Sequence, residues 1–593
     1  MLRDSDLVSI QEVRAKVEQA YAAFQQFRNF SQAQLDAIVE AMGAAARLHS
    51  ARLAQLAVEE TGYGNARDKL AKNLLAADML PRAIRGMKTI GVLREDTEKQ
   101  IVEIGVPVGV VAAILPTTNP TSSAIYKIII ALKSGNAIVL SPHPRAKACS
   151  CESAQVLYEA ARAAGAPEHI IQCINNATME GTEALMRHPR TSVILATGGA
   201  GIVRAAYSSG KPAYGVGPGN VPVLIDASAP LAEAVAKVVQ GKSFDYGTIC
   251  SSEQTIVGLA ASKAAILEEL RKCKAYLCSV EQSQALAKIL IAPNWRINPE
   301  CVGQSPTRIA QMAGFSVPAE TSILAAEIGG IGKAHPLSME KLSPVLSLLF
   351  VAGWEEQVRA CQAILKFGGL GHTSVIHATD PARIREYGLR IPSFRVLVNT
   401  PSPQGSTGIT TGLQPAMTLG CGAMAGNATS DNIGPQHLMN IKRVAMVIRK
   451  AEDAFEIPTA QQSATAGEVR HLVGAAVERF LTQRGLGAAP AIAPVTPAAA
   501  IVDRFLRSRT AAGSPTVTAA PAPAASCGTP PVVISPAPPP SPAIAISEFV
   551  CEADVRSALQ SNKKIHIGPR TIVTPSAREL GNQHDILVTA QRS

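Results

Sequence analysis

Hydrophobic positions along the first part of the chain follow two different spacings. Up to residue 86 the apolar side chains recur every three or four positions, as in Val13, Val17, Tyr21 and Phe24, and this spacing predicts helices over residues 9–86. Further on, short apolar runs predict strands at 106–115, 137–140, 170–174 and 192–196. Between these runs, helical spacing predicts helices at 122–134, 146–164 and 181–187. This alternation predicts a parallel, doubly wound sheet.

A second α/β region begins near residue 221. Its pattern predicts strands at 221–226, 254–257, 345–351, 374–377 and 395–399, helices at 232–241, 261–273, 281–290 and 354–365, and a closing strand at 441–449. We therefore divide the body into N-terminal helices with a dinucleotide-binding domain, residues 1–220, and a catalytic domain, residues 221–430. Residues 430–455 are expected to return and complete the first domain.

The sequence beyond residue 455 has a different character. Residues 456–486 predict an amphipathic helix, because Leu472, Val473, Val477 and Phe480 fall on one face. Residues 487–546 are rich in Ala, Pro, Ser and Thr and predict a disordered linker, with one short amphipathic segment at 498–507. The tail, residues 547–593, contains a possible helix at 552–559 and a possible strand at 565–573. The expected fold class is α/β with a largely disordered C-terminal extension.

Composition narrows the range of partners. The net charge is +10, but the basic residues are spread without a run of four, so a nucleic-acid groove is not expected and phosphorylated cofactors are a milder explanation. The eleven cysteines are scattered without a Cys-x-x-Cys pair, which predicts neither a disulfide framework nor a metal site and favours a reducing cytoplasm. The N-terminus has no apolar signal-peptide core, and no run approaches the ~18 apolar residues of a membrane span.

One cysteine lies in a polar loop, residues 243–254, between a predicted helix and a predicted strand. An isolated cysteine is more often a small buried hydrophobe. The neighbours of Cys250, however, are Ser, Thr, Gly and Glu rather than Leu and Val. Because loops after element boundaries can present a side chain to a substrate, we interpret Cys250 as a covalent nucleophile.

Two glycine clusters lie on the first region. Thr197-Gly-Gly-Ala-Gly201 follows a predicted strand and opens a helix, where backbone N–H groups can approach a pyrophosphate. An ordinary tight turn is the alternative. The second cluster is Tyr214-Gly-Val-Gly-Pro-Gly-Asn220, whose glycines permit close backbone approach.

Several motifs, in order, resemble one family over about residues 10–450. They are Pro116-Thr-Thr-Asn-Pro-Thr121, Phe244-Asp-Tyr-Gly-Thr-Ile-Cys-Ser-Ser-Glu-Gln254, Gly371-His-Thr373, Gly426-Asn-Ala-Thr-Ser-Asp-Asn432 and Asn440-Ile-Lys-Arg-Val444. They look like the CoA-acylating aldehyde dehydrogenases of the aldehyde dehydrogenase superfamily. The resemblance implies a Rossmann-type cofactor domain beside an α/β catalytic domain. Tyr246 stands where such enzymes usually carry Asn.

The resemblance also implies roles for individual residues. Cys250 matches the catalytic cysteine, and Asn119 matches the amide that holds the oxyanion together with the Cys250 backbone N–H. His372 is implied to deprotonate CoA or to line its channel, with a structural loop histidine as the alternative. The implied cofactor-binding residues are Thr117, Thr118, Thr197, Gly198, Gly199, Gly217 and Glu340, the last on the nicotinamide ribose. Ser141 replaces a lysine near the adenosine ribose, so NAD is expected and NADP stays open.

The most informative feature of this resemblance is a glutamate that the sequence lacks. Hydrolytic aldehyde dehydrogenases carry a glutamate that activates water, and the aligned residue here is Gly215. This predicts a pocket without a carboxylate to direct water at the acyl-cysteine, so that the thioester survives until CoA arrives. We expect oxidation of propionaldehyde or acetaldehyde to the acyl-CoA. The alternatives are sulfoacetaldehyde or succinic semialdehyde as substrate, a hydrolytic aldehyde dehydrogenase, and a catalytically silent shell-bound scaffold.

The C-terminal extension suggests where in the cell the protein is located. Its short apolar segments behind a Pro-rich stretch are similar to those of enzymes inside bacterial microcompartments, such as those for propanediol degradation. We expect a cytoplasmic, homo-oligomeric enzyme inside such a compartment, bound to shell or cargo proteins through the extension, with a spacer of no specific use as the alternative.

Overall fold

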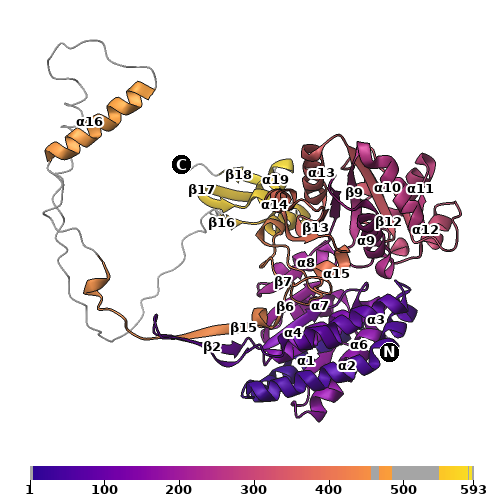
Figure 1. Cartoon of the computed structure of the whole chain (residues 1–593). Helices are drawn as coiled ribbons and strands as arrows, with labels where there is room; N and C mark the ends of the chain where they lie inside the picture. The colour runs from indigo at the N-terminus through magenta and orange to yellow at the C-terminus, as the bar shows by residue number, and fades with distance from the viewer. Residues whose placement is uncertain (1–3, 456–465, 484–546, 562, 585, 590–593) are drawn as a thin grey trace, which may run out of the picture. The chain divides into compact units, whose positions relative to one another are not determined.

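The computed structural model describes residues 4–455, 466–483, 547–561, 563–584 and 586–589 (Figure 1). The chain divides into two units, Met1–Ile457 and Pro458–Ser593. The predicted linker at 487–546, with its amphipathic segment at 498–507, lies outside the described residues.

The N-terminal region is helical, as the spacing predicts. Its helices are α1 (Ser5–Phe27), α2 (Gln32–Thr61), α3 (Ala66–Leu74) and α4 (Leu80–Ile84), with a π-helical segment, Leu75–Met79, between the last two. Ser31 and Gln34 form a capping box at the start of α2, and Gly62 ends that helix in the left-handed conformation, so local sequence fixes both ends.

The first parallel sheet has five strands in the order β5-β4-β3-β6-β7. The strands are β3 (Val110–Ile114), β4 (Ala137–Ser141), β5 (Ile171–Cys173), β6 (Thr191–Thr197) and β7 (Ala213–Val216). The helices between them are α5 (Pro120–Lys133), α6 (Lys147–Ala163), α7 (Met179–Arg187) and α8 (Ala200–Tyr207). The register pairs Ile114 with both Ser141 and Ala196, so the loops after β3, β4 and β6 emerge at one edge. The predicted parallel sheet is confirmed.

Helix α5 forms the centre of this region, because all fourteen of its residues are buried. Two of them are lysines. Lys127 Nζ donates to the carbonyl oxygens of Ile114 (2.6 Å) and Leu195 (3.0 Å), which joins the ends of β3 and β6. Lys133 pairs with Asp36 of α2. The helix therefore holds its own N-terminus, and the turn before it, at the sheet edge.

The predicted strand at 106–115 is wrong as one element. It is the end of β2 (Ile101–Pro107) and the whole of β3, separated at Gly109, which has φ +132°. A Cβ at Gly109 would overlap the Ser192 side chain, so the break requires glycine. Strand β2 pairs antiparallel with β1 (Gly91–Asp96) and with β15 (Met439–Ala445), which begins and ends earlier than the predicted closing strand (Figure 1).

The second sheet has seven parallel strands in the order β10-β11-β12-β9-β8-β13-β14. They are β8 (Val221–Ile225), β9 (Glu253–Leu259), β10 (Ala275–Leu277), β11 (Ile323–Glu327), β12 (Val345–Val351), β13 (Gly371–His377) and β14 (Ser393–Val398). The helices are α9 (Leu231–Ser243), α10 (Lys263–Lys272), α11 (Val280–Leu290), α12 (Pro306–Met312), α13 (Trp354–Phe367), α14 (Pro381–Arg390) and α15 (Ser402–Ser406). The short elements β10, β11, α12, α14 and α15 were not predicted.

The cysteines differ from expectation at one pair. Cys151 of α6 and Cys173 of β5 form a disulfide across 22 residues of sequence, which no spacing rule indicated. Among the described residues no group of His, Cys, Asp and Glu could hold a metal ion, and no described helix is long and apolar enough to cross a membrane.

The described part of the extension is folded. Helix α16 (Ala466–Gln483) lies within the predicted amphipathic helix. The tail forms a parallel sheet of β16 (Ser547–Val550), β17 (Ile565–Val573) and β18 (Leu587–Thr589), with helices α18 (Glu552–Gln560) and α19 (Pro575–Gln583). Its small core contains Val550, Val555, Ala558, Ala577 and Ile586. The tail helix and strand that the sequence indicated are both confirmed.

Candidate active site

Strand order in the second sheet brings four distant segments together. The loop 217–219 precedes β8, Cys250 precedes β9, Glu340 precedes β12, and His372 lies at the start of β13. These four strands are neighbours in the order β12-β9-β8-β13. Because parallel neighbours begin at the same edge, the segments converge although they span more than a hundred positions of sequence.

The sulfur of Cys250 has a histidine partner. His372 Nε2 lies 3.2 Å from Cys250 Sγ, and His372 Nδ1 lies 2.9 Å from Thr373 Oγ1. That hydroxyl in turn accepts a hydrogen bond from Arg395 Nε at 3.3 Å. Further bonds from the Arg395 guanidinium reach the carbonyl oxygens of Gly420 (2.6 Å) and Ser430 (3.1 Å). A chain of polar contacts therefore runs from a buried cation to the predicted nucleophile.

The Cys250–His372 pair is electrically neutral. Burial, reinforced by the nearby Glu340, raises the pKa of the Cys250 thiol to about 12. Burial, reinforced by Arg395, lowers the pKa of His372 to about 3. Thiolate–imidazolium pairs require the opposite shifts. The resting site therefore holds a thiol beside an uncharged imidazole.

One carboxyl group, that of Glu340, is close enough for its charge to act on Cys250. Glu340 Oε1 accepts a hydrogen bond from Gly219 N at 3.1 Å, and a Cβ at Gly219 would overlap the Cys250 carbonyl oxygen. Glycine is thus required where this loop passes behind the nucleophile. Burial raises the pKa of Glu340 to about 8, so the group is mostly uncharged at neutral pH.

The space beside Gly215, the position aligned with the missing glutamate, is occupied by side chains of α8. A Cβ at Gly215 of β7 would lie 2.7 Å from Val203 Cγ1 and 2.9 Å from Tyr207 Cε2, both on α8. The Tyr207 hydroxyl also accepts a hydrogen bond from Gly215 N at 3.0 Å. A glutamate at this position would have to displace side chains of α8.

The turn before α5 carries the predicted oxyanion amide. Asn119 is the N-cap residue of α5, yet in the described chain its side chain makes no capping hydrogen bond. Its Oδ1 instead accepts from Lys72 Nζ (2.6 Å), and its Nδ2 donates to Thr118 Oγ1 (3.0 Å). The same Lys72 donates to Thr248 Oγ1 at 3.3 Å, two residues before Cys250. One ammonium group thus joins the Asn119 turn to the nucleophile loop.

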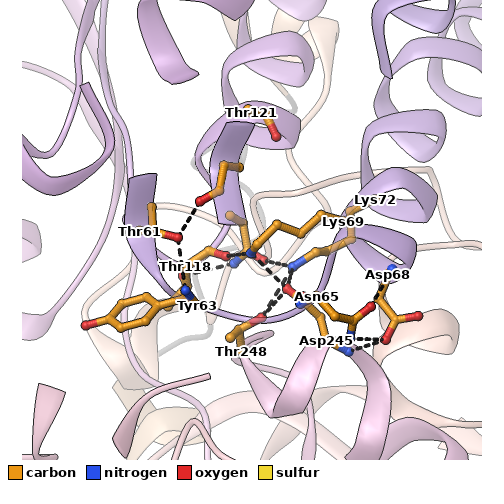
Figure 2. A network of polar contacts seen from close by, with 12 residues as sticks. Thr61, Tyr63, Asn65, Asp68, Lys69, Lys72, Thr118, Thr121, Asp245 and Thr248 are labelled. Atoms are coloured by element: carbon orange, nitrogen blue, oxygen red, sulfur yellow. Dashed lines mark hydrogen bonds and ion pairs between the residues drawn. The ribbon is translucent and has the colours of Figure 1, made fainter. Parts of the chain in front are cut away.

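Figure 2 shows the buried network around this ammonium. Lys69 and Lys72, one turn apart on α3, both pair with Asp245, and the three side chains are at most 2% exposed. Asp245 Oδ1 accepts from Asn65 N (2.8 Å), and Thr248 Oγ1 donates to Asp245 Oδ2 (2.6 Å). Burial alone would raise the pKa of Asp245, but the two lysines hold it below its ordinary value.

The backbone of the nucleophile loop is strained where this network holds it. Asp245, Tyr246 and Gly247 have φ values of 47°, 51° and 72°, and a bulky residue rarely adopts this left-handed region. Asp68 Oδ2 accepts from Asp245 N at 2.7 Å and helps to fix the conformation. Tyr246, the departure from the family motif, lines a separate cavity of about 500 Å³ that none of the predicted catalytic residues borders.

The predicted cofactor turn lies at the edge of the first sheet. Thr197 ends β6, Gly199 is the N-cap residue of α8, and a Cβ at Gly199 or Gly217 would meet nothing within 4 Å. Thr197 Oγ1 is buried and has no hydrogen-bond partner among the described residues. The open backbone at Gly199 and the unsatisfied Thr197 hydroxyl at a helix start fit a pyrophosphate, whereas a Cβ at Gly198 would meet Ile202 Cγ2 at 2.6 Å. Thr117 and Thr118 lie beside this turn, after β3, but Thr118 O already accepts from Lys69 Nζ (3.1 Å).

Sequence reasoning missed Lys69, Lys72, Asp245, Thr373 and Arg395. Asp245 and Thr373 lie inside motifs that the sequence had singled out. The lysines gave a fainter signal, a Lys-x-x-Lys spacing that places two cations on one face of a helix. Arg395 gave none, since a single arginine in a strand is ordinary.

Comparison with known proteins identifies a family model and relatives that the chain matches. The model of the family described as "Aldehyde dehydrogenase family" matches residues 5–282. The bifunctional aldehyde-alcohol dehydrogenase of Escherichia coli K12 is 42% identical over 444 residues, which are 74% of this chain and 50% of that protein. The chain thus spans about half the length of the first curated relatives it matches.

Two solved structures match more completely. An acetylating aldehyde dehydrogenase from Geobacillus thermoglucosidasius is 49% identical, with a TM-score of 0.75, and the match covers 76% of this chain and 99% of that one. A propionaldehyde dehydrogenase from the fucose utilisation bacterial microcompartment of Clostridium phytofermentans is 28% identical, with a TM-score of 0.67, covering 73% and 97%.

The neutral cysteine–histidine pair predicts unusual alkylation behaviour. A pKa raised to about 12 leaves almost no thiolate at neutral pH, so iodoacetamide should modify Cys250 slowly in the free enzyme. The rate should keep rising with pH past the ordinary cysteine value of about 8.5. Peptide mass spectrometry measures the rate, with the denatured protein as the control. A plateau below about pH 8 would mean that a thiolate is already present and would contradict the neutral pair.

Proposed function

The chain belongs to the aldehyde dehydrogenase family, among its CoA-acylating members, and we propose that it oxidises a short-chain aldehyde to the acyl-CoA through a thioester on Cys250. The observation that carries this proposal is the 3.2 Å contact between Cys250 Sγ and His372 Nε2. Cys250 belongs to a loop that Lys72 joins to the Asn119 turn. Nucleophile, proton partner and amide are the parts that such chemistry needs.

The first step is addition of the sulfur to the aldehyde. His372 Nε2 lies 3.2 Å from Cys250 Sγ, and we propose that the imidazole takes up the thiol proton. We propose that Asn119 Nδ2 and the Cys250 backbone N–H hold the oxyanion, and one such donor typically contributes about 3 kcal/mol. The product is a hemithioacetal on Cys250.

The turn at Thr197–Gly199 and the Glu340 carboxyl would hold the dinucleotide. NAD, when bound, supplies the acceptor for the hydride of the hemithioacetal. Ser141, at the position of the family lysine, is buried and its hydroxyl lies 2.8 Å from Thr182 Oγ1. Ser141 itself offers no positive charge to a 2′-phosphate, which supports NAD over NADP.

The acyl group then passes to the thiol of CoA rather than to water. Glu340 is the carboxyl group whose charge acts on Cys250, and at neutral pH it is mostly protonated. A protonated carboxyl cannot accept a proton from water. The relative from G. thermoglucosidasius is named acetylating, which agrees with transfer to CoA.

The substrate that we propose is acetaldehyde or propionaldehyde. Sulfoacetaldehyde and succinic semialdehyde carry an anionic group and would need a free cation in the pocket. Among the described residues, the cation whose charge acts on Cys250 is Arg395, and its guanidinium already donates to Thr373, Gly420 and Ser430. A small uncharged aldehyde therefore fits better.

We also propose that the extension docks onto shell or cargo proteins of a bacterial microcompartment in the cytoplasm. The support is a folded tail, residues 547–589, that follows an Ala- and Pro-rich stretch, and a similar enzyme that comes from such a compartment.

Removal of the nucleophile tests the function. Cys250→Ala should abolish both NADH formation and acyl-CoA formation from acetaldehyde, NAD and CoA, because the thioester cannot form. Cys273→Ala removes a thiol at the C-terminal end of α10 and should keep full activity. NADH absorbance and chromatography of acyl-CoA and free acid report the two steps. Aldehyde oxidation that survives in Cys250→Ala, or wild-type product that is free acid whether or not CoA is present, would refute the proposal.

The ionisation of Glu340 predicts that hydrolysis of the acyl-cysteine thioester depends on pH. Its pKa is raised to about 8, so the group is a neutral acid below that pH and a carboxylate base above it. At limiting CoA, the share of free acid in the product should therefore rise as pH passes 8. Glu340→Gln cannot ionise and should give a share that stays flat across the same range. An equal rise in both proteins would show that hydroxide, and not Glu340, drives hydrolysis.

The targeting proposal predicts where a reporter goes. A fluorescent protein fused to residues 487–593 should collect at microcompartments in cells that produce their shells. A fusion to residues 547–593 alone asks whether the folded tail is sufficient. Fluorescence that stays diffuse with the longer fusion would rule out targeting by the extension and would favour its interpretation as a spacer.

A further inference from the structure

We propose that Lys72 is the positioning residue of the oxyanion donor: its buried ammonium fixes and polarises the Asn119 amide. This inference rests on the proposed function, because it assumes that Asn119 Nδ2 holds the oxyanion. It adds a residue, a mechanism and a test that the assignment of Asn119 does not contain.

The chemistry of lysine decides which way the Asn119 amide points. The two ends of a carboxamide are hard to tell apart by shape, but an ammonium group can only donate hydrogen bonds. With Lys72 Nζ at 2.6 Å, the facing end must be Oδ1. The Nδ2 end then faces the opposite way, with one hydrogen donated to Thr118 Oγ1 and the second left for a ligand.

The position of Asn119 makes this restraint necessary. Asparagine at a helix N-cap normally turns its Oδ1 onto the N–H groups of the first turn. Here Asn119 holds the N-cap position of α5, but its oxygen goes to Lys72 instead. Without the ammonium, capping would compete for the oxygen and rotate the donor away from the site.

The cost of burying Lys72 also calls for a function. Lys69 and Lys72 are both buried, whereas among the described residues Asp245 is the fully buried carboxylate that pairs with them and Asp68 is only half-buried. Burial lowers the pKa of Lys72 to about 8, although Asp245 opposes the shift, so the group is still mostly charged at neutral pH. A cation on the oxygen of an amide strengthens its N–H donors.

Lys69 supplies a matched control. It lies on the same helix, is equally buried and pairs with the same Asp245 oxygen. Its second bond, however, goes to the carbonyl oxygen of Thr118 and not to Asn119. The two lysines therefore differ in the contact with the amide and in the bond from Lys72 to Thr248, and the Asn119→Ala background separates these two contacts.

A double-mutant cycle tests the proposal. Asn119→Ala should lower kcat for acetaldehyde oxidation about 100-fold, the loss typical of one oxyanion donor. Lys72→Met should lower kcat about 10- to 100-fold with little change in KM, and Lys72→Met/Asn119→Ala should be no slower than Asn119→Ala alone. Lys69→Met should lose clearly less kcat than Lys72→Met.

The rate of Cys250 alkylation separates positioning from collapse of the loop. A lysine that acts through Asn119 leaves this rate unchanged in Lys72→Met, whereas a disordered nucleophile loop would raise it. If Lys72→Met does not fold, Lys72→Gln keeps an N–H donor without the charge, and its loss should likewise vanish in the Asn119→Ala background.

Several outcomes would overturn the inference. Losses that multiply in the double variant mean that Lys72 acts elsewhere, and a wild-type kcat in Lys72→Met means that the amide needs no support. A wild-type kcat in Asn119→Ala removes the assumed oxyanion donor as well. Failure of the proposed function itself has a different signature, since Cys250→Ala would then keep its activity.

Discussion

The buried carboxylate of Asp245 is the interaction on which the catalytic geometry depends. It pairs with Lys69 and Lys72 and accepts hydrogen bonds from Asn65 and Thr248. Removing one partner from such a buried ion cluster typically costs about 3–5 kcal/mol, because the remaining charges are left uncompensated. The cluster joins α3, the turn before α5 and the nucleophile loop, and so it sets the position of Cys250 relative to Asn119.

Much of this arrangement could be predicted from sequence, because the signals are local. Apolar runs without polar alternation indicated the parallel strands, and a polar neighbourhood marked Cys250 as more than a core residue. The tail helix and strand were also visible as short periodic segments. The strand at 106–115 failed because only the close approach of Ser192 reveals why Gly109 must break it.

The remaining features depend on contacts between distant segments. Asp245 meets its lysines across 173 and 176 residues, and His372 meets Cys250 across 122. Strand order decides these pairs, and one sequence does not reveal strand order. The disulfide between Cys151 and Cys173 is more local, because β5 follows α6 directly in the chain, and it was missed because no Cys-x-x-Cys spacing marked the pair. Glu340 was expected at the cofactor, and its influence on the sulfur follows only from the adjacency of β12 and β9.

The charges around Cys250 are arranged unevenly, and this has a catalytic consequence. On the sulfur side, His372 and Glu340 are both mostly neutral at pH 7, and burial of Cys250 outweighs the Arg395 charge that would favour a resting thiolate. On the Asn119 side, Lys72 carries a positive charge behind an amide donor. A site with the opposite bias would bind the thiolate tightly and make it a weaker nucleophile. Here the favourable field is placed where negative charge develops during addition, and an interaction that strengthens in the transition state is the kind that raises kcat.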